Sequence, residues 1–281
     1  MPNPVRPPRS EFTRSLLQGA GIGLVLLAVL VPWIRSRQPH APPAAPAAAV
    51  APAAPAVAPG PLPDFAGEPV SQDTRKVANW AFYTRDAGGK SVVILDKKAA
   101  RVHVFDPAGK LLASTPALLG KAIGDDSAPG IGDKPLSQVK EEEKTTPAGR
   151  FVAEPGENAN GEDIIWIDYD AAVSMHRVRP LVAAERRLQR LASPTGADNR
   201  ISFGCVNLPV RFYEGTLSPI VKRTGAIVYV LPETRSVEET FGAWDVTDPQ
   251  ARPPRRTVAM AAADQDAADA RAPKQEREAT P

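Results

Sequence analysis

The sequence predicts a mainly β domain with a few helices, built as a sheet or β-sandwich, behind a single N-terminal transmembrane helix. Short runs rich in β-branched residues recur along the middle of the chain, one long apolar segment lies near its start, and proline is concentrated between the two. The formal charge is +2, from 34 basic and 32 acidic residues, and no run of basic residues exceeds two. Nucleic-acid binding is therefore not expected.

The apolar segment, residues 16–34, is uncharged and long enough, at about 1.5 Å per residue, to cross a hydrocarbon core of roughly 30 Å. We therefore interpret residues 15–37 as a single-pass anchor in the inner membrane. Three arginines and one glutamate lie in residues 1–14, so the positive-inside rule places this end in the cytoplasm and the rest of the chain in the periplasm. Secretion to the periplasm after cleavage of a signal peptide is the alternative.

The chain after the anchor divides by composition into three parts. Residues 38–63 are mostly alanine and proline, which favours an extended spacer. The globular domain is expected over residues 64–232, because the β-branched runs lie there. Residues 233–281 are rich in alanine and charged residues, which predicts a largely disordered tail, with Phe241 and Trp244 the side chains suited to dock on the domain.

Within the domain, the order of the expected elements follows from local signals. Residues 71–85 are expected to form a helix with Ser71 as its N-cap. A broken helix is expected at 212–223, interrupted at Gly215 and Pro219. Helices would then cover a mostly antiparallel sheet. The expected strands, each a short run rich in β-branched or aromatic residues, are 91–96, 101–106, 110–115, 150–154, 163–169, 172–178, 200–206 and 225–231.

The chain has one cysteine, Cys205, which excludes an intramolecular disulfide and a cysteine-based zinc site. In an oxidising compartment, a lone thiol is either buried and inert or kept for its reactivity. Gly204 directly precedes it, and glycine permits a tight turn whose amides can approach a developing oxyanion. The residues alone leave two interpretations open, a nucleophile and a small hydrophobic residue at a strand end.

Three histidines are the candidates for a base. His40 lies in the spacer, where no packed site can use it. His103 alternates with valines on an expected strand, and we interpret it as a solvent-facing or partly buried strand residue without a catalytic role. His176 ends an apolar run, and a cysteine–histidine pair needs spatial rather than sequential adjacency. His176 is therefore the candidate partner of Cys205.

Three features in order along the chain resemble the catalytic domain of the L,D-transpeptidase (YkuD-like) family. They are the Thr-Thr-Pro-Ala-Gly-Arg-Phe segment at 145–151, His176, and the Ser-Phe-Gly-Cys-Val-Asn stretch at 202–207. The family pattern is a Thr-Pro-x-Gly-x-Phe segment, then a histidine, then Ser/Thr-x-Gly-Cys. The resemblance covers about residues 91–232 and implies a YkuD-like fold for the domain.

The chain departs from this family pattern at three points. Phe203 stands where many relatives have histidine, and Asn207 stands where many have arginine, although asparagine also occurs there in the family. The interval between the histidine and the cysteine is also longer than usual, and residues 181–191 are expected to form an inserted amphipathic helix. This helix either forms a wall or lid of the site or packs three leucines onto the domain surface. These are Leu181, Leu188 and Leu191.

The resemblance implies peptidoglycan chemistry without a cofactor or a metal ion. The Cys205 thiolate would attack the carbonyl that joins diaminopimelate to the terminal D-alanine of a stem tetrapeptide, release D-alanine and hold the stem as a thioester. The amine of a second stem would then form a new peptide crosslink. Two alternatives are an L,D-carboxypeptidase, in which water resolves the thioester, and a non-catalytic membrane-anchored module that binds wall peptides.

The resemblance also implies roles for individual residues. His176 would act as general base and then as general acid, with the Arg177 carbonyl orienting its ring. The Gly204 and Cys205 amides would stabilise the oxyanion. Four further side chains are expected at the site, where Ser202 and Asn207 would shape it and Arg179 and Arg200 would bind carboxylates of the stem peptide.

Overall fold

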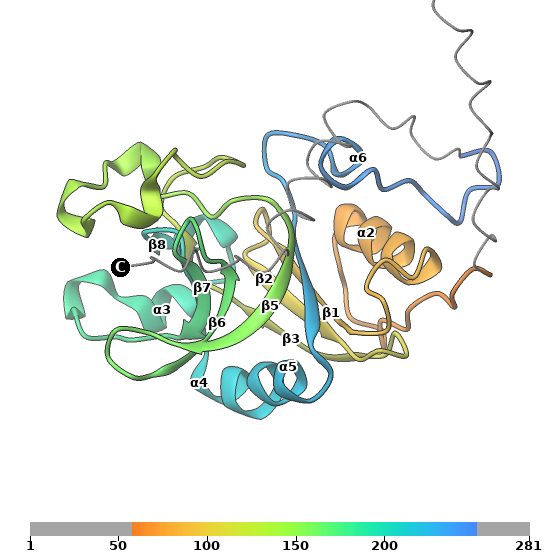
Figure 1. The fold of residues 1–281 in the computed structure, drawn as a ribbon, viewed down its shortest axis with the longest axis horizontal. Helices are drawn as coiled ribbons and strands as arrows, with labels where there is room; N and C mark the ends of the chain where they lie inside the picture. The colour runs from red at the N-terminus through yellow and green to blue at the C-terminus, as the bar shows by residue number, and fades with distance from the viewer. Residues whose placement is uncertain (1–57, 252–281) are drawn as a thin grey trace, which may run out of the picture. The chain divides into compact units, whose positions relative to one another are not determined.

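The computed structural model describes residues 58–251 (Figure 1). The predicted anchor at 15–37 and nearly all of the predicted spacer at 38–63 therefore lie outside the described residues. Within 58–251, no helix combines the length and the apolar composition needed to cross a bilayer.

The first helix, α2 (Gln72–Tyr83), lies where the sequence predicts it. The Ser71 hydroxyl accepts a hydrogen bond from the Thr74 amide at 3.0 Å and so caps the first turn, as expected for a serine N-cap. One face of the helix is buried, with Val77 and Ala81 fully covered. This face packs against the sheet, where the Trp80 ring meets the Tyr229 ring edge-on at a centroid distance of 6.2 Å.

An eight-stranded sheet in the order β3-β2-β1-β10-β5-β6-β7-β9 forms the centre of the domain. Pairs β1–β10 and β7–β9 are parallel, and the other neighbours are antiparallel, which agrees with the mostly antiparallel expectation. Its strands are β1 (Ser91–Asp96), β2 (Arg101–Phe105), β3 (Leu111–Pro116), β5 (Gly149–Glu157), β6 (Asp163–Asp168), β7 (Val173–Arg177), β9 (Val206–Leu208) and β10 (Ala226–Val230).

Helices, rather than a second large sheet, cover the faces of this sheet. In β1, Val92 and Ile94 belong to the apolar cluster with α2, whereas Val93 and Leu95 belong to the cluster with the helical residues 212–221. Every residue of β1 is buried, which explains its continuous apolar run, since a strand covered on both faces does not alternate. Of the two forms that the sequence allows, the sheet is the one observed.

The segment that the sequence predicts as one strand at 200–206 is two strands. β8 (Arg200–Ser202) pairs with β4 (Leu119–Gly120) in a small separate sheet, and β9 joins the large sheet. The chain turns between them at Gly204 and Cys205. This turn places the cysteine at the boundary of two sheets rather than within a strand.

The helix predicted at 212–223 does not break. It continues through α4 (Val210–Phe212), the π-helical turn η6 (Tyr213–Leu217) and α5 (Ser218–Thr224). Gly215 lies in the wide π turn, and Pro219 lies in the first turn of α5, where its missing amide hydrogen is not needed.

The folded domain extends beyond the predicted boundary at residue 232. Helix α6 (Val237–Phe241) begins with a capping box in which the Ser236 hydroxyl accepts from the Glu239 amide. Val237 is buried, and the Phe241 and Trp244 rings contact Tyr229 and Trp80 respectively. The part of the predicted tail at 233–251 is therefore folded. Its few apolar side chains all face the core, so composition understates its burial.

The inserted segment forms two short pieces instead of one helix over 181–191. They are η4 (Ala183–Glu185) and α3 (Arg187–Leu191), separated by Arg186 with a φ of +50°. Leu191 is buried, but Leu181 and Leu188 are 75% and 53% exposed. Of the two alternatives for this segment, packing of all three leucines on the domain is not observed, because the left-handed residue breaks the helical spacing on which it depends.

The remaining segments are loops with single 3-10 turns. The long connection between β4 and β5 contains η1 (Ile131–Asp133), η2 (Leu136–Gln138) and η3 (Glu141–Glu143). The turn η5 (Gly196–Asn199) precedes β8. The end of the long connection, at Thr145 and Thr146, returns to the cysteine turn and takes part in the site.

Candidate active site

Cys205 is half-buried in a turn, and only glycine fits the position directly before it. Gly204 has a φ of +142°, and a Cβ there would lie 2.8 Å from the Thr145 carbonyl oxygen. The Thr146 hydroxyl donates to the Gly204 carbonyl oxygen at 2.7 Å and accepts from the Gly120 amide at 2.9 Å. The Thr-Pro segment thus supports the cysteine turn directly.

Ser202 closes the same turn from the other side. Its hydroxyl donates to the Cys205 carbonyl oxygen at 2.6 Å and accepts from the Gly204 amide at 3.1 Å. The Gly204 amide is therefore occupied within the turn, which corrects its expected role as an oxyanion donor. The Cys205 amide makes no hydrogen bond to the protein within residues 58–251 and remains the donor available to an oxyanion.

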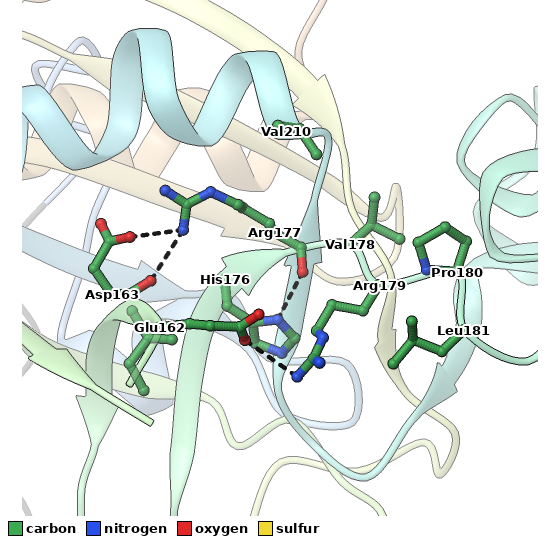
Figure 2. A pocket seen from close by; sticks show the side chains of 10 residues that line it. Glu162, Asp163, His176, Arg177, Val178, Arg179, Pro180, Leu181 and Val210 are labelled. Carbon is green, nitrogen blue, oxygen red and sulfur yellow. Dashed lines mark hydrogen bonds and ion pairs between the residues drawn. The ribbon is translucent and has the colours of Figure 1, made fainter. Parts of the chain in front are cut away.

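His176 lies on β7, and its Cα pairs with that of Asn207 on the parallel strand β9. Its Nδ1 lies 2.8 Å from the Arg177 carbonyl oxygen (Figure 2). Because a carbonyl oxygen only accepts, Nδ1 carries the proton and Nε2 of the neutral ring holds the lone pair. The ring is thereby oriented with Nε2 toward the Asn207 amide, 3.4 Å from its Nδ2.

Cys205 lies in the turn directly before β9, the strand that pairs with His176 on β7. Burial raises the pKa of the Cys205 thiol, but the His176 ring and hydrogen bonds with Ser174 outweigh it, so the pKa lies below its ordinary value. The sulfur lies 3.7 Å from the Ser174 hydroxyl and 3.6 Å from the Ala172 carbonyl oxygen. The structure thus brings the two predicted residues together with the polarity of an activated thiol.

Asn207 is buried beside this pair, and its amide connects several groups. The Nδ2 atom donates to the Cys205 carbonyl oxygen at 3.2 Å and lies 3.4 Å from His176 Nε2. The Oδ1 atom accepts from Arg187 Nη1 at 2.5 Å. Sequence reasoning missed Arg187. The available signal was that an insertion carrying arginines accompanies an asparagine where many relatives have arginine.

The three arginines predicted at the site have different surroundings. Arg177 pairs with Asp163 at 2.8 Å and with Glu214 at 2.7 Å, so its carbonyl rather than its guanidinium serves His176. Arg179 pairs with Glu162 at 3.1 Å beside the site, and both side chains are partly exposed. Arg200 instead points into a buried ion-pair network, where it pairs with Glu233 and donates to the Lys97 carbonyl oxygen. Its expected role in carboxylate binding is not supported.

That buried network lies next to the cysteine turn. Lys97 is fully buried and donates to Asp125 at 2.9 Å and to the Thr146 carbonyl oxygen at 3.0 Å. Asp125 also accepts from the backbone amides of residues 233–235. Burial raises the pKa of Asp125, but hydrogen bonds from Thr234 and Lys97 bring it down to about 2. Burial lowers the pKa of Lys97, which its hydrogen bond to Asp125 partly offsets, and the pair lies behind Thr146.

A hollow of about 320 Å³ opens beside His176 (Figure 2). The Glu162 carboxylate and the Arg179 guanidinium line it on one side, and Leu181 and Val210 line it with apolar surface. Leu181 is the first residue of the inserted segment, so this segment forms part of the wall. Within residues 58–251, no group of His, Cys, Asp and Glu side chains is arranged to hold a metal ion.

No protein-family model and no curated protein sequence matches the chain. Among solved structures, the chain is similar to the catalytic domain of the L,D-transpeptidase of E. faecium, at 19% identity and a TM-score of 0.32 over 51% of this chain and 98% of that one. It is also similar to an L,D-transpeptidase from Mycobacterium smegmatis, at 16% identity and a TM-score of 0.30, with 51% and 58% covered.

A third similar structure is the helical cell shape determining protein Pgp2 from Campylobacter jejuni, at 14% identity and a TM-score of 0.33, with 52% and 48% covered. The chain thus spans less than two thirds of the Mycobacterium and Campylobacter proteins.

Proposed function

We propose that the chain is a cysteine-dependent L,D-transpeptidase that acts on peptidoglycan stem peptides through a thioester. The observation that carries the proposal is the place of Cys205 directly before β9, beside a His176 ring on β7 whose Nδ1 donates to the Arg177 carbonyl and which lowers the pKa of the thiol. A nucleophile, a base and a third group that orients the base are what covalent acyl transfer requires. The family resemblance supplies the substrate class, a tetrapeptide that ends in diaminopimelate and D-alanine.

In the first half-reaction, the Cys205 thiolate attacks the diaminopimelate carbonyl carbon in its bond to D-alanine. Negative charge develops on the carbonyl oxygen, toward which the unpaired Cys205 amide can donate. When the intermediate collapses, the C–N bond breaks, and the proton on His176 Nε2 passes to the leaving amine. The products are free D-alanine and a thioester between the stem and Cys205.

In the second half-reaction, the amine of another stem attacks the thioester carbonyl, and His176 Nε2 takes its proton. The C–S bond breaks, the new amide forms, and the sulfur leaves as thiolate. The side chain of diaminopimelate ends in an amine and a carboxylate on the same carbon. The hollow beside His176 presents both a carboxylate, Glu162, and a guanidinium, Arg179, which suits an acceptor of this kind.

The test is to incubate the full chain with purified disaccharide tetrapeptides and to follow the products by mass spectrometry. Release of D-alanine with formation of crosslinked dimers is the expected result, and Cys205→Ala should abolish both. Release of D-alanine without dimers would assign the chain as an L,D-carboxypeptidase. Binding of the muropeptide without any release would overturn the catalytic proposal in favour of the wall-binding module.

The proposal includes a location, with the domain in the periplasm and the chain anchored in the inner membrane by residues 15–37. It is supported by the apolar length of that segment and by the arginines before it. A reporter that is active only in the cytoplasm, fused after residue 251, should stay silent. Strong reporter activity would reverse this topology.

A further inference from the structure

Two departures from the family pattern meet at one hydrogen bond. The inserted segment supplies Arg187, and its Nη1 donates to Oδ1 of Asn207, the residue that stands where many relatives have arginine. Asn207 is 1% exposed, and the Arg187 side chain is 15% exposed. The contact therefore lies inside the protein, directly behind the catalytic pair.

Both partners of this bond are held in place. The Asn207 backbone is fixed by two hydrogen bonds of 2.9 Å with Leu118, one in each direction. Arg187 Nε pairs with Glu185 at 2.6 Å. The Glu185 carbonyl oxygen in turn accepts from Arg190 Nε at 2.8 Å. The inserted segment thus delivers one guanidinium nitrogen to one amide oxygen.

The chemistry of the guanidinium decides which way the amide points. Arginine only donates, so the atom of the Asn207 amide that faces it must be the oxygen. The NH₂ group is then forced to the other side, where it meets the Cys205 carbonyl oxygen and His176 Nε2. Without a pure donor at this position, the amide can turn over and exchange the two atoms.

We propose that Arg187 is a positioning residue of the active site, which fixes the Asn207 amide with its NH₂ group, rather than its oxygen, toward His176 Nε2. This inference rests on the proposed function, in which Cys205 and His176 do the chemistry. It also gives the insertion a specific role, because the insertion carries the group that orients the asparagine.

The orientation matters for the path of the catalytic proton. In the present arrangement, the NH₂ group cannot accept a proton from Nε2, so a protonated His176 donates to the sulfur or to the leaving amine. A reversed amide would place Oδ1 against Nε2 and against the Cys205 carbonyl oxygen. The oxygen would accept the Nε2 proton and draw the ring away from Cys205, and the thiolate would lose the contact that stabilises it.

Three substitutions at one position separate this role from packing. Arg187→Lys keeps a group that only donates, Arg187→Gln offers both a donor and an acceptor, and Arg187→Met offers neither. Arg186→Gln is the matched control, because Arg186 is the neighbouring residue, carries the same charge and has an exposed side chain. Each full-length variant is compared for thermal unfolding, for D-alanine release, and for the rate at which iodoacetamide alkylates Cys205 across pH 5 to 10.

We expect Arg187→Gln and Arg187→Met to release D-alanine roughly tenfold to a hundredfold more slowly than the unmodified chain. Their alkylation profiles should move to higher pH, because the pKa of Cys205 is lowered by its contact with His176. Arg187→Lys should keep most of both properties, and Arg186→Gln should match the unmodified chain. The other charged groups near the ring are paired in all variants, Glu162 with Arg179 and Asp163 with Arg177.

Three outcomes overturn the inference. One is an alkylation profile that is the same for all four variants. Another is a loss in Arg187→Lys as large as in Arg187→Met, which would indicate packing or a need for the guanidinium shape. The third concerns the Asn207→Leu background, in which no amide remains to orient and Arg187→Gln should have no further effect. If Arg187→Gln has as large an effect there as in the unmodified chain, the inference is wrong. Alkylation needs no peptidoglycan, so a chain that releases no D-alanine can still pass or fail this test.

Discussion

Two histidines occupy strands of the same sheet, and their surroundings differ in the properties that a general base needs. His103 on β2 is 1% exposed, and its Nδ1 lies 2.7 Å from the Ser114 hydroxyl, which can donate or accept. His176 on β7 is partly exposed, and its Nδ1 faces a carbonyl that only accepts. A catalytic histidine therefore needs a fixed tautomer and access to a second reacting group, whereas His103 has neither.

Removing each ring should produce the largest contrast. His176→Ala should lower D-alanine release by about a hundred- to ten-thousandfold, because general acid–base assistance has that magnitude. His103→Gln should retain release in the fraction of protein that is folded. Both rates are measured per mole of folded protein, counted by circular dichroism. A comparable loss in His103→Gln would remove the distinction between the two histidines.

The second contrast is in how stability depends on pH. Burial lowers the pKa of His103 from 6.5 to about 4. A depressed pKa means that the unfolded chain binds the proton more readily, so the stability is complete above about pH 6.5 and is lost as the pH falls toward 4. The loss should be about 3 kcal/mol.

Urea unfolding at pH 7 and pH 4.5 measures this effect. His103→Gln should be less stable at pH 7 and should show a smaller change between the two pH values. An unchanged pH dependence in that variant would show that the burial of His103 is not its cause. The interpretation of His103 as a solvent-facing or partly buried residue is corrected by the structure, since its ring is 1% exposed and hydrogen-bonded to Ser114.

A smaller effect is expected from the hydroxyl that accompanies the buried ring. Ser114→Ala leaves His103 Nδ1 without its partner in a buried site, which should cost about 1–3 kcal/mol in the free energy of unfolding. D-alanine release at a permissive temperature should not change. Denaturant midpoints at constant slope give the value, and Ser114→Thr, which keeps the hydroxyl, is the control.

The smallest effect is expected from the serine beside the catalytic pair. Ser174→Ala removes a hydrogen bond of 3.7 Å to the Cys205 sulfur, one of the weaker influences that lower the pKa of that thiol. The iodoacetamide profile should therefore move to higher pH by less than about one unit. A shift as large as that of His176→Ala would mean that Ser174, and not the imidazole, activates the thiol.

The elements that the sequence predicts well are those whose signal is local. The N-cap of α2 and the β-branched runs of β1 and β10 depend on neighbouring residues, so they lie where expected. Cys205 and His176 stand out in the sequence because the chain has one cysteine and three histidines, and the structure places them on neighbouring parts of the sheet. The glycine at 204 is a local signal for the turn before Cys205, since the backbone there requires glycine.

Long-range pairing explains most of what the sequence does not reveal. The sequence around Arg200 does not indicate that Arg200 forms an ion pair with Glu233. The sequence of the insertion likewise does not indicate that Arg187 donates a hydrogen bond to Asn207. The spacing of the leucines in the insertion predicts one helix, but Arg186 adopts a left-handed conformation that interrupts it. The folded part of the tail is hidden in a similar way, since only a few apolar residues anchor α6.

The position of β10 has a consequence for the order of folding. Within residues 58–251, β10 is the last strand along the chain, yet it lies in the interior of the sheet, between β1 and β5. Its pairing with β1 joins residues more than a hundred positions apart, such as Ser91 and Ala226, and such distant contacts form slowly. When the chain is exported from its N-terminus, the sheet cannot be completed until β10 has emerged. In the proposed periplasmic location, the Cys205 thiol is by then already outside the membrane. Because Cys205 is the chain's sole cysteine, the incompletely folded chain cannot form a non-native intramolecular disulfide.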